Sequence, residues 1–223
     1  MLLCVVVAKR SYRQYCPIAC ALDLLGERWT FLVVRDLLLG PQRYGDLLAG
    51  LPGLSTDLLA DRLHALESGD VIRRRRLPAP AGSTVYELTA VGEELWNILS
   101  PLAQWGGRLM GPPADTEDRL DHRWALLAMA AGYHGPPNRT ETYQLIVDDE
   151  AFAFEVQDGR ARVRRGENPN RAVVVRTDAA TFLAVVSGAM TPSAARRRHI
   201  AYLDGDATAY DRLIRDAGLT FGS

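Results

Sequence analysis

One stretch in the first half of the chain constrains its fold more than any other. Residues 56–68 carry leucines at the spacing of one helical face, and Gly69 marks the point where that helix ends. Two runs typical of β-strands follow at residues 71–77 and 84–88, and the Pro- and Gly-containing segment between them predicts a hairpin. The first of these strands carries four consecutive arginines, at positions 73–76. A short amphipathic helix therefore leads directly into a strongly basic hairpin.

Helices on both sides of this stretch complete the module. Three shorter helices are predicted upstream, over residues 17–25, 31–39 and 44–49, with Thr30 as the cap of the second. Downstream, a long helix reaches about residue 109, and its apolar residues recur at intervals of four and three, which predicts a seam against a partner helix. The residues of this seam are Val91, Leu95, Ile98, Leu102, Trp105 and Leu109. This order of elements predicts a winged helix-turn-helix, in which residues 56–68 would enter the major groove of DNA.

The pattern changes in the second half of the chain. The segment Gly111-Pro112-Pro113 predicts a domain boundary, and short strands mixed with helices follow it. The predicted helices cover residues 117–133, 179–187, 192–198 and 208–217, and the predicted strands cover residues 143–147, 151–157, 161–165, 172–177 and 200–203. The fold class is therefore α+β, with an N-terminal winged helix-turn-helix in residues 9–110 and a small α+β domain in residues 117–221.

The charge balance limits how such a module could hold nucleic acid. The chain has 26 Lys and Arg against 27 Asp and Glu, a formal net charge of −1, so DNA binding would have to come from a local basic patch. We find no glycine-rich phosphate loop, nucleophile elbow or metal-ligand spacing, which predicts that the chain is not an enzyme and uses no cofactor or metal. Three clustered cysteines and the lack of a long apolar run predict a cytoplasmic protein with no membrane partner.

The face of helix 56–68 opposite its leucines carries the residues placed to read base edges. On and around this face we predict DNA contacts by Ser55, Thr56, Asp57, Ala60, Asp61, Arg62 and His64. Asp57 and Asp61 would repel phosphate, although either could accept a hydrogen bond from a cytosine amino group. Arg62 has two open roles, because it could contact phosphate or pair with Asp61 or Glu67.

The basic hairpin supplies candidates for contact with the DNA backbone. Alternation along a strand sends two of the four arginines to each face, so at least two of them can reach phosphate or the minor groove. The predicted contacts are Arg74, Arg76, Ser83 and Thr84, together with Arg43 beside the N-terminus of an upstream helix. This interpretation requires that residues 56–64 lie on the surface and that the arginines are not held by carboxylates.

Several linked motifs in the first 110 residues resemble those of the HxlR family of bacterial regulators. In order, they are Tyr15-Cys16-Pro17-Ile18-Ala19, Leu24-Leu25-Gly26-Glu27-Arg28-Trp29-Thr30, Arg43-Tyr44-Gly45-Asp46-Leu47, Leu58-Leu59-Ala60-Asp61-Arg62-Leu63 and Tyr86-Glu87-Leu88-Thr89. The resemblance implies a homodimeric, cytoplasmic winged-helix transcription regulator that binds double-stranded DNA at a pseudo-palindromic operator. It also implies that the first helix and the long helix after the wing form the dimer, which agrees with the apolar seam.

Cys16 offers an alternative mode of regulation. It lies at the predicted start of the first helix, where the helix dipole favours a thiolate, the form that reacts with oxidants. Some members of the HxlR family use a cysteine near this position to sense oxidants or electrophiles. The chain could therefore be a thiol-based redox regulator, although Cys16 could instead be a small buried residue.

Short motifs in the second half resemble those of a sterol-carrier-protein-like domain over about residues 141–219. They are Val156-Gln157-Asp158-Gly159-Arg160, Asp178-Ala179-Ala180-Thr181-Phe182-Leu183, Ser187-Gly188 and Leu203-Asp204-Gly205-Asp206. The resemblance implies a pocket for a small hydrophobic ligand that would modulate DNA binding. Candidate lining residues are Trp124, Tyr133, Phe152, Phe154, Phe182, Val186 and Met190, which could instead fill an ordinary core. A further alternative is a lipid- or small-molecule-binding protein whose winged helix no longer binds DNA.

Overall fold

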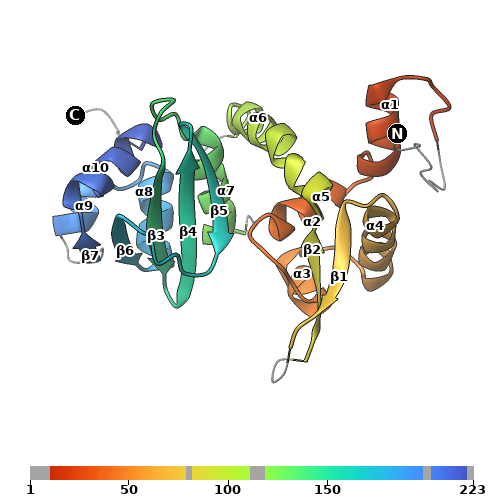
Figure 1. Ribbon diagram of the computed structural model, residues 1–223, viewed down its shortest axis with the longest axis horizontal. Helices are drawn as coiled ribbons and strands as arrows, with labels where there is room; N and C mark the ends of the chain where they lie inside the picture. The colour runs from red at the N-terminus through yellow and green to blue at the C-terminus, as the bar shows by residue number, and fades with distance from the viewer. Residues whose placement is uncertain (1–10, 79–81, 111–118, 198–201, 220–223) are drawn as a thin grey trace. The chain divides into compact units, whose positions relative to one another are not determined.

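The computed structural model describes residues 11–78, 82–110, 119–197 and 202–219. The chain has a mixed α+β fold and divides into two compact units, residues 1–99 and 100–223 (Figure 1). Each unit is described by itself below. No helix within the described ranges is long and apolar enough to cross a membrane.

The first unit is a winged helix-turn-helix. Its elements are α1 (Pro17–Leu25), α2 (Thr30–Leu37), α3 (Tyr44–Gly50), α4 (Thr56–Ser68), β1 (Ile72–Arg76), β2 (Thr84–Leu88), α5 (Ala90–Glu94) and the start of α6 (Trp96–Gly107). Strands β1 and β2 pair antiparallel, with Ile72 opposite Leu88 and Arg76 opposite Thr84. On the other side of β2, Gln42 forms an isolated bridge to Tyr86. The wing is thus tied to the segment before α3.

Local sequence signals explain why α4 forms where it does. The Ser55 hydroxyl accepts a hydrogen bond from the backbone N–H of Leu58 at 3.3 Å, which caps the first turn. Leu59, Leu63 and Leu66 are each at most 1% exposed, so the predicted stripe is the buried one. At the end of the helix, a Cβ on Gly69 would lie 2.7 Å from a methyl carbon of Leu24, so any larger residue would require the Leu24 side chain of α1 to move.

The start of α2 differs from the prediction. Thr30 is not the cap but the first helical residue, and its side chain is buried. Trp29 takes the cap position in the left-handed region, with φ 79°. Its ring lies against Gly53, where an added Cβ would come within 3.7 Å of it. This tertiary contact fixes the backbone at Trp29, and a capping rule based on neighbouring residues cannot anticipate it.

The predicted long helix after the wing consists of two helices. Thr89 caps α5 by accepting a hydrogen bond from the backbone N–H of Gly92 at 3.1 Å. The helical run is interrupted at Leu95 and resumes as α6, which contains Pro101 without ending there. The interruption falls beside Gly92, where an added Cβ would lie only 2.1 Å from the Val71 carbonyl oxygen. Close packing of α5 on the wing therefore accompanies this break, whereas the sequence pattern predicts one long helix to about residue 109.

The second unit contains a five-stranded sheet and its helices. The elements are α7 (His122–Gly132), β3 (Glu141–Val147), β4 (Glu150–Gln157), β5 (Arg160–Arg165), β6 (Val173–Thr177), α8 (Ala179–Val186), α9 (Pro192–Arg197), β7 (Tyr202–Gly205) and α10 (Ala207–Asp216). The strand order is β5-β4-β3-β6-β7, in which β3 and β6 are parallel and the other neighbours are antiparallel. The last strand runs to Gly205, two residues beyond the predicted end. Gly205 has φ +102° and lies too close to the Ala172 carbonyl for any Cβ, which explains a glycine there.

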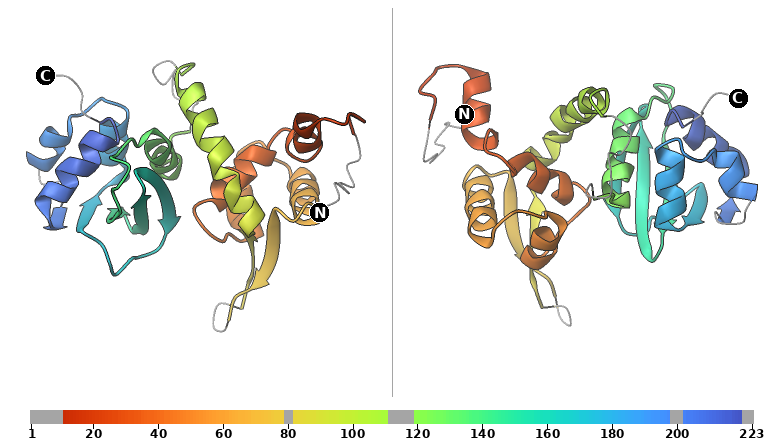
Figure 2. Two further views of the ribbon diagram at one scale, coloured as in Figure 1. Left: turned by 45° about the horizontal axis from the view of Figure 1, so that its top comes forward. Right: turned by 180° about the vertical axis from the view of Figure 1, so that it is seen from behind.

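The two faces of this sheet are covered differently. Helices α7, α8 and α10 pack on one face (Figures 1 and 2), where Tyr143, Phe152 and Phe154 form the centre of the core and are fully buried. On the opposite face, the buried Gln144 side chain accepts a hydrogen bond from the backbone N–H of Asn168 at 2.8 Å. The loop after β5 therefore covers part of the face that carries no helix.

Candidate nucleic-acid interface

Helix α4 presents one face to solvent and the other to the core. Thr56, Asp57, Ala60, Asp61 and His64 are all exposed, as the DNA-binding interpretation requires. Because the leucine stripe fills the opposite side, rotation of the helix about its axis would expose core residues. The exposed face of α4 is therefore held in a fixed orientation.

A hydrogen bond that sequence reasoning missed anchors the beginning of α4. The Tyr44 hydroxyl donates to the Thr56 carbonyl oxygen at 2.7 Å, which ties α3 to the first residue of α4. Next to Tyr44, the backbone N–H of Arg43 donates to the Asp46 carboxylate at 3.3 Å, and the Arg43 side chain is exposed. The aromatic residue of the motif Arg43-Tyr44-Gly45-Asp46-Leu47 was the available signal for this role.

Arg62 has neither of the partners considered for it. Its Nη1 lies 3.5 Å from the Glu27 carboxylate, and its side chain is only 14% exposed. Glu27 precedes α2, so the ion pair turns Arg62 away from the predicted reading face and toward the α1–α2 junction. The helix placed to read bases thus exposes two carboxylates and one histidine, while its single arginine is engaged elsewhere.

The wing arginines are less free than predicted. The Nε of Arg73 and the Nε of Arg75 both donate to Glu87, at 2.8 and 2.7 Å. Burial of Glu87 by itself would raise the pKa of its carboxyl group, but the hydrogen bonds and positive charges of Arg75 and Arg73 outweigh this and lower it. The requirement that no carboxylate hold these arginines is therefore not met on this face of the hairpin.

The other two arginines lie on the opposite face of the hairpin. Arg74 pairs with Glu67 at 2.8 Å and lies over the Tyr86 ring at 5.6 Å. Its side chain remains 51% exposed, and exposed pairs of this kind contribute at most about 1 kcal/mol, so phosphate can compete with Glu67. Arg76 donates from Nε to the Gly82 carbonyl at 3.4 Å, a weak contact. Arg76 is thus held by the weakest of these contacts, and Arg74 keeps an exposed ion pair that phosphate can replace.

The far end of the wing supplies fewer polar groups than predicted. Thr84 is exposed at the start of β2, but Ser83 is half-buried, with its hydroxyl oxygen inaccessible and without a hydrogen-bond partner. Residues 79–81, part of the predicted tip, lie outside the described residues. Ser83 in this conformation does not face solvent and is poorly placed for a DNA contact.

The cysteines of α1 differ from each other. Cys16 is a half-buried free thiol at the N-cap of α1. Cys20, one turn further along, is disulfide-bonded, which the small number of cysteines did not predict. Cys16 is therefore the thiol of α1 that is available for reaction.

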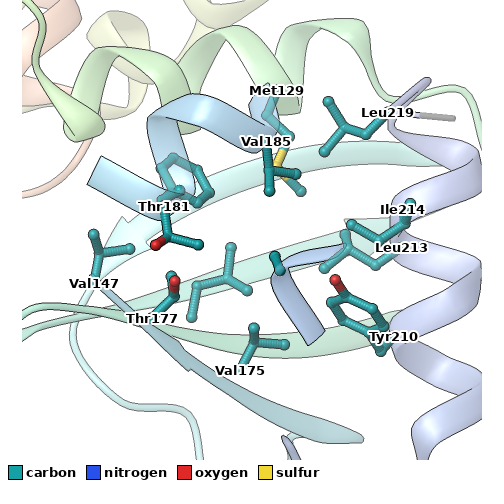
Figure 3. Close-up of a pocket in the computed structure, with 13 residues that line it drawn as sticks. Met129, Val147, Val175, Thr177, Thr181, Val185, Tyr210, Leu213, Ile214 and Leu219 are labelled. Carbon is teal, nitrogen blue, oxygen red and sulfur yellow. The ribbon is translucent and has the colours of Figure 1, made fainter. Parts of the chain in front are cut away.

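The second unit contains an apolar cavity of about 40 Å³ (Figure 3). Helices α8 and α10 close it above strands β3 and β6, and Met129 of α7 and Ala195 of α9 complete its wall. The other lining residues are Leu145, Val147, Val175, Thr177, Thr181, Phe182, Val185, Tyr210, Leu213, Ile214 and Leu219. In Figure 3 the Thr177 and Thr181 hydroxyls lie near one another, and the remaining wall is almost wholly hydrocarbon.

Of the residues predicted to line a pocket, only Phe182 contributes to this cavity. Phe152 and Phe154 instead fill the core beside α7, and Tyr133 packs edge-on against Phe154 at 5.7 Å. The other predicted residues, Trp124, Val186 and Met190, are half-buried and do not line this cavity. The aromatic side chains lie on β4 and beside α7, whereas the space is left between α8, α10 and the β3–β6 side of the sheet.

Comparison with known proteins places the similarity in the first unit. The model of the HxlR-like helix-turn-helix family matches residues 24–113. The HTH-type transcriptional regulator sll1512 of Synechocystis sp. is 41% identical over 91 residues, which are 41% of this chain and 67% of that protein. The regulator YodB of Bacillus subtilis is 32% identical over 44% of this chain and 88% of its own length.

YodB has also been solved as a structure in several chemical states. The reduced form covers 46% of this chain and 100% of the YodB chain, with 31% sequence identity and a TM-score of 0.39. Other structures of YodB are a quinone-bound form and a diamide-treated form.

Proposed function

This chain belongs to the HxlR-like helix-turn-helix family of transcriptional regulators, and from that premise we propose that it acts as a homodimer on a pseudo-palindromic operator. Each protomer places α4 in the major groove of one half-site. The observation that carries this proposal is the orientation of α4. Its leucine face is buried, while the opposite face exposes Thr56, Asp57, Ala60, Asp61 and His64. The Tyr44–Thr56 hydrogen bond keeps the leading end of the helix in place.

Phosphate contacts come from arginines flanking α4. Arg43 is exposed beside the N-terminus of α3, and Arg74 and Arg76 occupy the wing face away from Glu87. These contacts fix the register of α4 on the duplex but read no sequence. Arg73 and Arg75 are both paired with the largely buried Glu87, so we assign them a secondary role in the complex.

Exposed apolar residues on α1 and α6 support the homodimer. Ile18 is 71% exposed on α1, and Ile98 and Trp105 are 50% and 57% exposed on α6. Side chains of this size in a row on a helix mark a surface that another chain covers. Leu95, although it belongs to the predicted seam, is buried inside the first unit and does not contribute.

Titration of a DNA fragment from upstream of the gene tests the proposal. The intact protein should form a specific complex whose affinity falls with increasing salt, because cations leave the phosphates on binding. Arg76→Ala should weaken binding to all sequences and reduce the slope of log affinity against log salt by about 1 per protomer. Arg171→Ala, an exposed arginine of the second unit, is the matched control. Absence of any salt-sensitive specific complex would favour the small-molecule-binding alternative.

A hydrophobic ligand in the cavity of the second unit would provide regulation. The sterol-carrier-like interpretation of this unit stays part of the proposal, and the apolar wall in Figure 3 suits a ligand without charge. The cavity of about 40 Å³ is far smaller than the roughly 300–1,000 Å³ of ligand pockets, so the proposal requires the wall to open when a ligand binds. Ala195→Val places two extra carbon atoms in a space of about 40 Å³. This variant should bind the operator like the wild-type protein and lose the response to small apolar compounds. A response that persists in the variant would place the effector elsewhere.

A second candidate is redox control through Cys16. The free, half-buried thiol at the start of α1 favours it, as do the diamide-treated and quinone-bound forms known for YodB. Operator binding is measured before and after treatment with diamide, for the wild-type protein and for Cys16→Ser. Loss of the response in Cys16→Ser supports this candidate, and an equal response in both proteins removes it.

A further inference from the structure

The exposed face of α4 carries charge of the sign that DNA repels. Asp57 and Asp61 are one helical turn apart on this face, and like charges at this spacing destabilise a helix. Asp57 lies in the first turn, where the positive end of the helix dipole compensates its charge. Asp61 lies one turn further on, beyond the reach of that compensation. The helix dipole therefore explains an acidic residue at Asp57 but does not explain one at Asp61.

Neighbouring cations do not neutralise Asp61 either. Within the described part of the chain, no hydrogen bond or ion pair engages its carboxylate. Arg62, the adjacent cation, is directed to Glu27, and Arg74 of the wing is directed to Glu67. The remaining ionisable neighbour on the face is His64, which is also exposed. Asp61 thus presents two free acceptor oxygens near the middle of the surface that would meet DNA.

The chemistry of the major groove determines what such a group can bind. A carboxylate cannot approach phosphate, so it must face base edges, where the hydrogen-bond donors are the cytosine N4 and adenine N6 amino groups. A carboxylate pairs with the cytosine amino group, whereas adenine also offers an acceptor, N7, that an ionised acid cannot satisfy. We propose that Asp61 reads a cytosine amino group in each operator half-site, an inference that rests on the proposed function.

The sharpest test changes the acceptor chemistry of Asp61 without changing its size. Wild-type protein, Asp61→Asn and the control Asp149→Asn, at an exposed position of the second unit, are each used to select sequences from a randomised duplex library. Wild-type protein should require cytosine at one position of each half-site. Asp61→Asn should prefer adenine there, because a carboxamide makes two hydrogen bonds to adenine N6 and N7. Asp149→Asn should keep the cytosine preference.

Binding affinities measured on duplexes of defined sequence give the size of the preference for cytosine. Replacing the selected cytosine in one half-site should weaken wild-type binding by roughly 5- to 150-fold and leave the affinity of Asp61→Asn unchanged or improved. Equal thermal unfolding of the three proteins shows that the substitutions leave the exposed helix folded. If Asp61→Asn selects the same bases as the wild type, the inference is overturned while the proposed function stands. If the wild type selects no sequence at all, both are overturned.

Discussion

The Glu87 carboxylate is 8% exposed and lies between the guanidinium groups of Arg73 and Arg75. A buried carboxylate without partners would be costly, so the two arginines are part of the local structure of the wing before they are part of any interface. This pairing links Glu87, near the end of β2, to residues 73 and 75 of β1. The hairpin face formed by Arg73, Arg75 and Glu87 is consequently close to +1 in charge rather than +2.

Glu87 should make the stability of the first unit depend on acidity. Because its folded pKa lies below the ordinary value of 4.5, its contribution is complete above that pH and is lost as the pH falls through the folded pKa. Urea unfolding at several pH values measures this for the wild type and Glu87→Gln. The variant should be less stable at pH 7, and the difference should shrink below about pH 4.5. A difference that stays constant down to pH 3 would contradict this role.

Tyr44→Phe isolates one hydrogen bond at the leading end of α4. Loss of the bond to the Thr56 carbonyl should reduce stability by about 0.5–1.5 kcal/mol. Operator affinity should fall several-fold with the salt slope unchanged, since no phosphate contact is removed. Fluorescence anisotropy with labelled operator measures both quantities, and Tyr15→Phe, at an exposed position before α1, is the control. An unchanged affinity would show that α4 does not need this anchor.

Gly92 allows α5 to approach the wing closely, and a substitution tests whether this position tolerates a side chain. An added Cβ would lie 2.1 Å from the Val71 carbonyl oxygen, a backbone atom that cannot move alone. Gly92→Ala should therefore destabilise the protein by roughly 1–3 kcal/mol, as over-packing generally does. Gly45→Ala, where an added Cβ meets nothing within 4 Å, should be neutral or up to about 1 kcal/mol stabilising. Similar effects for the two variants in urea unfolding would argue against the close approach.

Among the elements, α6 exposes a row of large apolar side chains that we expect a second protomer to cover. Ile98→Glu places a charge among exposed apolar residues, so it should shift the protein from dimer to monomer and weaken operator binding by at least tenfold. Asn97→Glu, at the neighbouring exposed position, adds the same charge outside the apolar row and should leave the dimer intact. Sedimentation velocity measures the association state. A monomeric wild-type protein at micromolar concentration would contradict the assignment of α6.

Elements with strong local signals could be predicted from the sequence. Helix α4 begins and ends at the predicted residues because a capping serine, a leucine stripe and a terminal glycine all agree. The break at Leu95 and the left-handed Trp29 could not be predicted, because both accompany contacts with residues distant along the chain, Val71 and Gly53. The same limit applies to the wing: arginines are visible in the sequence, but their partner Glu87 becomes their neighbour only through strand register.

The cavity of the second unit illustrates this limit for a whole domain. Its wall combines residues from two strands and four helices that lie far apart in the sequence, such as Leu145, Val175 and Leu213. Large aromatic residues were the candidates that the sequence offered for the pocket wall. In the folded unit they fill the core, and the cavity is lined mostly by aliphatic side chains. Pattern analysis found the α+β class and most element positions, whereas the location of the cavity depends on packing.

For the whole molecule, the net charge of −1 makes binding to DNA depend on a few contacts. Three phosphate contacts per protomer, from Arg43, Arg74 and Arg76, give about six per dimer. The slope of log affinity against log salt should then be roughly −5, at about −0.9 per contact. Titrations between 50 and 300 mM salt, about the range in which such slopes are measured, supply the value. A slope of about −9, the value for about ten contacts per dimer, would mean that Arg73 and Arg75 leave Glu87 to join the interface.

The strand order of the second unit has a consequence for how the chain is made. Strand β3 is central and pairs with both β4 and β6, and the edge strand β7 pairs with β6, so the sheet cannot be complete until the residues up to Gly205 have left the ribosome. The wing and helices of the first unit, by contrast, draw their contacts from residues 1–99. During synthesis the first unit can therefore complete its core before all strands of the second unit have left the ribosome. A nascent polypeptide would acquire its DNA-facing module first and its cavity-bearing module last.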